Sequence, residues 1–487
     1  MGFTEYYVNI FVSLVLFAFL GLILNLFHEL VVKPMKLQAI LLKQGIKGPP
    51  LSLLIGNIRE IKKAQSSIVK VPSTHPLPLT TAVHYSFHSL SNGGNNMVCQ
   101  VFVFSLGTTQ TLLVNQPDAV KEITTCMSLA LGKPSYQQKD RGPLKILSPE
   151  LYMDNVRMNL IVESTFTLVD SWKTRIEVDS GIADIKIDEY MRSFSGDVIS
   201  RACFGSNYCK GEEIFLKLRA LREAMSKKGL STGVPRMRYL PIKSNREAWE
   251  LEKEVRDLIL HVVKERKGAA TYEKDFLQMV SRSHRFVVDN CKNIYLAGYE
   301  TTAVSATWCL MLLAANQEWQ DNVRTEVVEI CRARTPDAGM LRKMKLLTKV
   351  IQESLRLYLP VAVVSREALE DIKFGEIFVP KGVNIWMMVL ALHTDPEIWG
   401  EDAYRFNPDR FSNGIKGACK LPQVYMPFGV GPRVCLGQNL AMVELKLLMS
   451  LLLSNFSFSL SPNYTHSPVL RLVIERENGV HILVKKL

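Results

Sequence analysis

The sequence predicts a mainly α-helical protein: a large helical domain with a smaller β-rich part, preceded by an N-terminal transmembrane helix. Three observations indicate this class. The stretch from about 150 to 350 is helical in pattern and poor in proline, strand signals gather at two places, and the first thirty residues contain a long apolar run. No internal repeat or low-complexity tract interrupts the chain.

The composition favours a folded, membrane-associated protein with reduced thiols. Of the 487 residues, 47% are hydrophobic, which is enough for a large core. The 9 cysteines are scattered without a CxxC pair, which indicates reduced thiols on the cytosolic side instead of a disulfide framework. The net charge of +12 suits an anionic membrane surface, an acidic protein or nucleic acid, but the basic residues are dispersed. We therefore expect no nucleic-acid partner.

The N-terminus predicts a membrane anchor over residues 1–32. Tyr6 to Phe27 contains no charge and is long enough to cross a bilayer as a helix. Lysines at 33, 36, 43 and 47 follow it, so the bulk of the chain is expected on the cytosolic side. Residues 33–50 read as a basic, proline-containing hinge that ends at Pro49-Pro50, and 51–487 as one domain.

Two places carry the strand signals. Residues 100–104 and 111–114, with Leu106-Gly107 between them, predict a pair of antiparallel strands. Near the C-terminus, residues 472–474 and 480–484 flank Asn478-Gly479, which is a typical turn of a β-hairpin. We therefore expect small sheets beside a mainly helical body.

Residues 286–315 predict one helix of about 45 Å that crosses the core. Gly298, Glu300, Thr301 and Thr302 stand in its middle, where glycine costs about 1 kcal/mol relative to alanine. A carboxylate and hydroxyl groups in an apolar helix also need partners. They indicate either a solvated or bent helix edge, or a local distortion that opens a groove large enough for dioxygen.

Residues 428–437 form a glycine-rich loop that contains Cys435 and precedes a helical stretch at 438–446. The amide groups and dipole of a helix N-terminus stabilise a thiolate, so a lowered pKa is expected for Cys435. Gly429, Gly431 and Gly437 permit a flat ligand to approach the backbone closely. Taken alone, Cys435 also fits a buried structural thiol.

The pattern Phe-x-x-Gly-x-Arg-x-Cys-x-Gly resembles the haem-binding loop of cytochrome P-450 monooxygenases, and the resemblance to that fold covers nearly the whole chain. The resemblance implies that Cys435 is the axial ligand of haem b and that Arg433 pairs with a haem propionate. It also places Phe428, Gly437 and Gly298 at the cofactor site.

Other residues take roles from the same resemblance. Glu300 and Thr301 match the acid–threonine pair that delivers protons to dioxygen. Glu353 and Arg356, spaced i,i+3 on one helix face, would form a buried structural network with Arg410. Their roles are expected to be structural, not catalytic.

The stretch 360–366 resembles a pocket-lining segment whose arginine, here Arg366, contacts a propionate. His393 is a landmark of the family; it either reaches a propionate or is a satisfied structural histidine.

The implied activity is insertion of one oxygen atom into a small lipophilic substrate, with electrons from NADPH through cytochrome P-450 reductase. The implied location is the endoplasmic reticulum membrane, with one span and a cytosolic catalytic domain. The segments 293–302 and 425–428 resemble a plant branch that hydroxylates or epoxidises gibberellins and related ent-kaurenoid diterpenes. The apolar stretch 361–364 is compatible with a diterpene.

The chain departs from the family where a helix with Trp-x-x-x-Arg is expected. No such helix lies between the stretch 142–144 and the stretch 145–151, and the first tryptophan in the chain is Trp172, so a segment about one helix long is missing. Residues 81–99 and the link before Arg285 also differ from the pattern. The alternative is therefore a catalytically inactive, truncated paralogue or splice form that binds haem poorly. A basic membrane scaffold would leave the Cys435 pattern unexplained.

Overall fold

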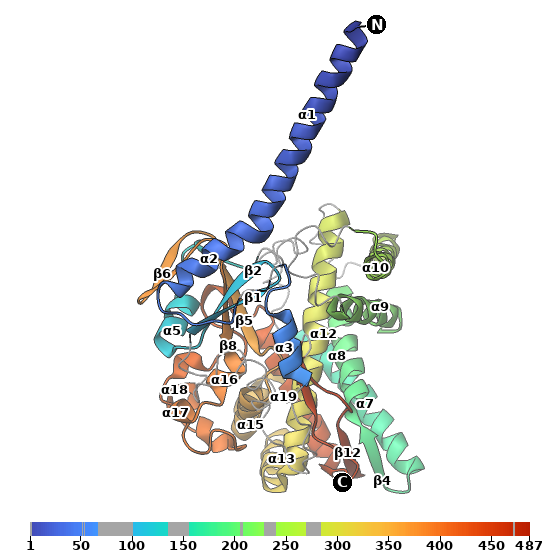
Figure 1. Ribbon diagram of the computed structural model, residues 1–487. Helices are drawn as coiled ribbons and strands as arrows, with labels where there is room; N and C mark the ends of the chain where they lie inside the picture. The colour runs from blue at the N-terminus through green and yellow to red at the C-terminus, as the bar shows by residue number, and fades with distance from the viewer. Residues whose placement is uncertain are drawn as a thin grey trace.

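The computed structural model describes residues 2–50, 52, 54–66, 101–134, 155–204, 208–227, 240–268, 284–470 and 473–487. Helices form most of this part of the chain, small sheets lie among them, and one helix extends away from the body (Figure 1). The mainly α class predicted from the sequence is thus confirmed. In the part of the chain that the structure describes, Cys126, Cys291, Cys309, Cys331, Cys419 and Cys435 have free thiols.

The N-terminal helix is long and apolar enough to cross a membrane. Helix α1 (Gly2–Phe27) continues through a π-helical turn, η1 (His28–Val32), into α2 (Lys33–Leu42). The candidate span Tyr6–Leu42 contains an 18-residue window with a mean hydropathy of 2.7, and none of this window is buried. The first ten residues of the predicted hinge are thus helical. They pack on the body, because Leu41 is fully buried and the Gln38 side chain donates to the Pro49 carbonyl.

A five-stranded sheet has the order β1-β2-β8-β5-β3. Strands β1 (Val101–Leu106) and β2 (Thr109–Val114) are antiparallel, which confirms the first predicted pair of strands. Strand β2 runs parallel to β8 (Asn384–Met388), which pairs with β5 (Val363–Ala368), and β5 with β3 (Leu131–Gly132). Because β5 carries Arg366, this sheet fixes the position of a predicted cofactor-binding residue.

The predicted C-terminal hairpin around Asn478-Gly479 is wrong. Strand β11 (Ile474–Arg476) pairs with β10 (Pro468–Leu470), whereas β12 (His481–Lys486) lies between β4 (Ile182–Lys186) and β9 (Phe456–Leu460). After the turn, the Val480 N–H donates to the Asp188 carboxylate and the Val480 carbonyl accepts the Ile187 N–H. These contacts direct the chain into a different sheet.

Helix α12 (His284–Ala315) confirms the predicted long helix and runs along the body (Figure 1). Residues 302–314 are buried. Helices α9 (Tyr208–Lys227) and α10 (Lys243–Gly268) lie on one side of it, and the five-stranded sheet lies on the other (Figure 1).

Further contacts with α12 come from α8 (Ile187–Phe204), α13 (Gln317–Cys331), α15 (Lys345–Leu357) and α19 (Gln438–Asn455). Other elements are α3 (Ile58–Ser66), α5 (Pro117–Thr125), α7 (Asn155–Val178), α14 (Ala338–Lys343), α16 (Val389–His393), α17 (Pro396–Trp399), α18 (Gly414–Ala418), η4 (Pro408–Phe411), η5 (Pro422–Val424), η6 (Gly431–Arg433), β6 (Ile372–Phe374) and β7 (Ile377–Val379).

Candidate functional site

The cysteine loop, residues 426–437, holds Cys435 immediately before a helix. The Cys435 N–H donates to the Phe428 carbonyl at 2.8 Å, and the Val434 N–H donates to the Gly431 carbonyl at 3.1 Å. Helix α19 begins at Gln438, three residues after the cysteine. The loop therefore fixes Cys435 just before the N-terminus of α19, as the sequence predicts.

The electrostatic surroundings of the Cys435 thiol differ from the prediction. Cys435 is exposed, so it is not a buried structural cysteine. Desolvation by the surrounding protein nevertheless raises its pKa, and the hydrogen bond from the Gly437 backbone only partly opposes this effect. The expected lowering by the helix N-terminus is wrong, because one amide dipole does not outweigh the loss of water. A thiolate at this position needs a cation beside the sulfur.

Two glycines shape the loop through positive φ angles, +70° at Gly429 and +71° at Gly431. A Cβ added at Gly431 would lie 2.1 Å from the Thr124 carbonyl oxygen of α5, so any side chain there would displace the backbone. At Gly437 the nearest atom to an added Cβ would be the Cys435 sulfur at 4.0 Å. Gly431 is thus required for packing against α5, whereas the absent side chain of Gly437 leaves space next to the sulfur.

Arg366 on β5 and Arg433 on η6 lie near each other. Burial, together with the positive charge of Arg433, lowers the pKa of Arg366. The Arg366 side chain donates to the Ser365 carbonyl at 2.9 Å. Neither arginine forms an ion pair with any residue that the structure describes. A carboxylate between the two guanidinium groups would offset their repulsion.

Gly298 packs against α8 and does not mark a break in α12, which is continuous α-helix from His284 to Ala315. A Cβ added at Gly298 would lie 2.6 Å from Ile199 Cδ1, and the Ser195 hydroxyl donates to the Gly298 carbonyl at 2.9 Å. The expected local distortion is therefore absent. The physical reason for this glycine is the close approach of two helices.

The structure does not bring the side chains of Glu300 and Thr301 together. Glu300 is 1% exposed, and its Oε2 atom lies 3.8 Å from Arg192 Nε on α8. The half-buried Thr301 donates its hydroxyl hydrogen to the Ala297 carbonyl of the same helix at 2.6 Å. The carboxylate thus faces α8, while the hydroxyl is bonded within α12.

Glu444, which the sequence reasoning missed, links α19 to α12. Its carboxyl group is buried, and burial raises its pKa to about 8, although a hydrogen bond with Thr302 acts in the opposite direction. This bond joins the helix that follows Cys435 to the residue after Thr301. The sequence feature that could have identified Glu444 is its position as a carboxylate within the apolar run 440–453, because a buried carboxylate needs a partner.

Glu353, Arg356 and Arg410 come together in a buried network. Arg356 Nε and Nη2 each lie 2.7 Å from one oxygen of Glu353, and neither residue is exposed. Arg410 Nε lies 3.6 Å from Glu353 Oε1. Arg356 also donates to the carbonyls of His393 and Ala403, and the Asn407 N–H donates to Glu353. The network joins α15 to the loops before the cysteine loop.

His393 is a neutral structural histidine. It is fully buried, and burial with the nearby Arg356 charge lowers its pKa to about 3. Its Nε2 atom accepts the Met426 N–H at 3.0 Å, at the start of the cysteine loop. Of the two alternatives left open by the sequence, the structure favours support of the loop.

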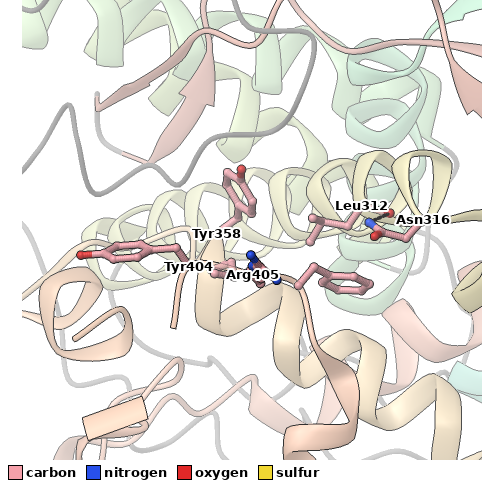
Figure 2. A pocket seen from close by; sticks show the side chains of 7 residues that line it. Leu312, Asn316, Tyr358, Tyr404 and Arg405 are labelled. Carbon is pink, nitrogen blue, oxygen red and sulfur yellow. Dashed lines mark hydrogen bonds between the residues drawn. The ribbon is translucent and has the colours of Figure 1, made fainter. Parts of the chain in front are cut away.

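A separate cavity of about 320 Å³ lies at the C-terminal ends of α12 and α15, and Figure 2 shows its side chains. It contains none of the residues predicted to be catalytic. Its lining consists of Leu312, Asn316, Leu357, Tyr358, Tyr404, Arg405 and Phe406.

Three predictions concern segments that the structure does not describe. The segment where Trp-x-x-x-Arg is expected, residues 81–99 and the link at 269–283 lie outside the described residues. Within the described part, no group of three or more His, Cys, Asp or Glu residues could hold a metal ion. A metal bound by these residues would need a different set of ligands, for example a single cysteine thiolate.

Comparison with known proteins identifies the family. A family model described as Cytochrome P450 matches residues 137–482. Cytochrome P450 714C2 of Oryza sativa subsp. japonica is 44% identical, with 98% of this chain and 97% of the relative covered. Cytochrome P450 714B3 of Zea mays is 41% identical, with 98% of this chain and 96% of the relative covered. Cytochrome P450 714A2 of Arabidopsis thaliana is 37% identical, with 94% of this chain and 95% of the relative covered.

The alignment with the first relative spans 516 positions, more than the 487 residues of this chain. That relative therefore contains segments that this chain lacks.

Proposed function

The chain belongs to the cytochrome P450 family of monooxygenases, and from that membership we propose that it is a membrane-anchored haem-thiolate enzyme. It inserts one oxygen atom of dioxygen into a gibberellin or a related diterpenoid, by hydroxylation or epoxidation. NADPH supplies the electrons through cytochrome P-450 reductase.

The observation that carries this proposal is the setting of Cys435. The thiol is exposed, it stands directly before the N-terminus of α19, and two arginines with mutually repelling charges lie nearby. A haem fits these residues, because its iron supplies the cation that the thiolate needs and its propionates supply carboxylates for Arg366 and Arg433.

The roles of the chain's own residues follow from this arrangement. Cys435 would hold the iron, Arg366 and Arg433 would hold the propionates, and Phe428 and Gly437 would border the ring. The bound haem supplies the activation of dioxygen and the transfer of oxygen, and the protein supplies orientation and a dry pocket. Gly298 would fix the position of α12 through its close packing against Ile199 of α8.

Glu300 and Thr301 would move protons to the site, from the Glu300 carboxyl group to the Thr301 hydroxyl. Since Glu300 faces Arg192 and Thr301 bonds to Ala297, the two side chains must rotate before they exchange a proton. Glu353, Arg356 and Arg410 would act structurally, because they fix α15 and the loops that lead to Cys435.

The substrate assignment rests on the resemblance of residues 293–302 and 425–428 to enzymes that oxidise gibberellins and ent-kaurenoid diterpenes. An apolar stretch is compatible with it: Val361 is 44% exposed and begins the stretch 361–364 that leads into β5. Helix α1 and the lysines after it support an anchor in the endoplasmic reticulum membrane, with the domain 51–487 on the cytosolic side.

The comparisons do not support the alternative of an inactive, truncated paralogue or splice form. Relatives match nearly the whole chain, including the segments around Cys435 and Glu353. Sequencing of the full transcript tests the alternative directly, because a recovered Trp-x-x-x-Arg segment would identify the present chain as a shortened form.

The decisive experiment expresses the full chain in microsomes with cytochrome P-450 reductase. We expect a reduced carbon-monoxide difference spectrum of the thiolate type, lost in Cys435→Ala, and NADPH-dependent turnover of a member of a labelled gibberellin panel. A haem-loaded chain with only a histidine-type spectrum would refute Cys435 as the ligand. A thiolate spectrum without turnover of any diterpenoid would refute the substrate class.

A further inference from the structure

We propose that Gln44, which directly follows α2, is a positioning residue for the cysteine loop. Its side-chain amide holds the hairpin β6–β7 against the N-terminal helix, and α5 joins this hairpin to the cysteine loop. The inference rests on the proposed membrane anchor and on Cys435 as the proposed haem ligand, and it connects the two. A lipid bilayer that holds α1 would thereby also support the loop that holds the haem.

The N-terminal helix reaches the body without a flexible break. The Lys33 N–H donates to the His28 carbonyl, so the π-helical turn η1 joins α1 to α2 with its hydrogen bonds intact. Residues 33–42, which the sequence predicts to be part of a hinge, are helical. The direction of α1 therefore depends on how α2 is fixed to the body.

Helix α2 is fixed to the body at its C-terminal end. Leu41 is fully buried, and Gly45 ends the helix with a φ of +80°, so the chain turns back toward the five-stranded sheet. The Val103 N–H of β1 then donates to the Lys47 carbonyl at 2.9 Å. Gln44 lies in the turn between these two contacts, so its backbone is held on both sides.

The Gln44 side chain takes the place of a strand at the edge of the hairpin β6–β7. Its Oε1 atom accepts the Phe378 N–H at 2.8 Å, and its Nε2 atom donates to the Phe378 carbonyl at 2.8 Å. An edge strand presents such a donor and acceptor on the same side of one residue. A primary amide can satisfy both, because it has one acceptor oxygen and a donor nitrogen.

The same hairpin is held from another side by α5, and Figure 1 shows α2, β6 and α5 together at one side of the body. The Glu122 carboxylate accepts the N–H of Gly375, in the turn of the hairpin, at 2.9 Å. Phe374 and Val379 are buried and fix the two strands on the body. The hairpin also connects β5, which carries Arg366, to β8. It therefore lies between the anchor and elements that carry predicted haem-binding residues.

Helix α5 extends the contact to the cysteine loop. The Thr124 carbonyl of α5 lies so close to Gly431 that a Cβ at this glycine would come within 2.1 Å of the oxygen. Helix α5 also contacts η5, which leads into the loop. Gln44 and Glu122 thus belong to one series of contacts that begins at the anchor and ends at the cysteine loop.

Both links of this series lie at the surface, because Gln44 and Glu122 are exposed. Water competes for exposed hydrogen bonds, so the loss of either link should leave the fold intact. Its effect should instead be local: the hairpin becomes more mobile, α5 loses part of its support, and the cysteine loop becomes less well ordered.

The test compares variants of the full-length protein in phospholipid bilayer discs. Gln44→Met removes both the donor and the acceptor at similar size, and Gln44→Glu keeps an acceptor but places a negative charge against the Phe378 carbonyl. Glu122→Ala removes the second link, and Glu122→Gln keeps an acceptor for it. The controls are Lys43→Met and Lys121→Ala, which change exposed neighbours of the two residues.

The first readout is hydrogen–deuterium exchange in peptides that cover residues 372–379 and 426–437, which needs no turnover. We expect exchange about threefold or more faster in both segments for Gln44→Met, Gln44→Glu and Glu122→Ala, and recovery toward the wild type in Glu122→Gln. Both controls should match the wild type. Faster exchange confined to the hairpin in the Gln44 variants would overturn the inference, and so would unchanged exchange in both segments.

The second readout is the rate at which the reduced carbon-monoxide spectrum loses its thiolate-type form at raised temperature. We expect this rate to increase about threefold or more in Gln44→Met and in Glu122→Ala. The double variant should lose the form no faster than the faster single variant, because both links act in one series. Wild-type rates in both single variants would contradict the proposal, and so would independent, multiplying effects in the double variant.

Failure of the proposed function would be seen separately, as a wild type that forms no thiolate-type spectrum. Hydrogen–deuterium exchange on the full haem-free chain would then still decide whether the order of the cysteine loop depends on Gln44.

Discussion

Arg433 lies near enough to Arg366 that its positive charge, added to the effect of burial, lowers the pKa of Arg366. Two guanidinium groups that repel each other weaken the fold unless an anion joins them. We therefore expect Arg433→Gln to reduce the haem retained per protein after gel filtration by several-fold, without lowering the unfolding temperature of the haem-free protein. Arg342→Gln, an exposed arginine of α14, is the control. Equal haem content in both variants would contradict an anion site between Arg366 and Arg433.

The buried pair Glu353–Arg356 should be sensitive to the loss of one partner. Arg356→Ala leaves the Glu353 carboxylate buried beside unpaired carbonyl groups, so we expect a loss of about 3–5 kcal/mol in the free energy of unfolding. Lys349→Ala removes an ion pair with the exposed Asp409 and should cost less than about 1 kcal/mol. Chemical denaturation of both variants measures the difference, and similar losses would show that the network carries little of the stability.

Gly431→Ala should damage the cysteine loop, whereas Gly437→Ala should be far milder for folding. At Gly431 the new Cβ would meet the Thr124 carbonyl in a positive-φ conformation, and we expect a cost of about 2 kcal/mol or more. At Gly437 the nearest atom lies 4.0 Å away and φ is −87°. Thermal unfolding of the haem-free proteins checks this order. An unchanged unfolding temperature in Gly431→Ala would show that α5 can move to accommodate the added methyl group without loss of stability.

Gly298→Ala should be destabilising by about 1–3 kcal/mol, although alanine is the better helix former. The added Cβ would overlap with the Cδ1 and Cγ1 atoms of Ile199 on α8. Ile199→Ala removes those atoms, so Gly298→Ala should cost less in that background than in the wild type. A double-mutant cycle by chemical denaturation measures this coupling. Strict additivity would mean that the helices do not meet at this point.

Glu444 should make stability depend on pH. Its pKa is about 8 in the folded protein and its usual value is 4.5, so between these values the folded state keeps a proton that the unfolded chain releases. The free energy of unfolding should fall by up to about 5 kcal/mol as pH rises through this window. Above the window it should no longer change with the ionisation of Glu444.

In Glu444→Gln this part of the pH dependence should disappear, so the variant should be the more stable protein at pH 9 but not at pH 5. Glu401→Gln, an exposed residue, serves as control. Denaturation curves that respond to pH in parallel for the wild type and Glu444→Gln would contradict a buried, protonated carboxyl group.

Features that depend on local order could be predicted from the amino-acid sequence. Hydrophobic length identified α1 and α12, the strand pattern gave the β1–β2 pair, and spacing identified Cys435 before its helix and the Glu353–Arg356 pair. In each case the interacting groups lie within a few residues or one element, so periodicity and turn chemistry are sufficient to predict them.

Which distant groups come into contact could be learned only from the folded chain. Glu300 and Thr301 are adjacent in sequence, yet their side chains diverge because α8 brings Arg192 to one face of α12. Asn478-Gly479 turns the chain between two sheets instead of closing a hairpin, because Asp188 binds Val480. The pKa of Cys435 rises because desolvation outweighs a nearby helix amide. Each outcome depends on contacts and burial contributed by residues far along the chain, which no local pattern contains.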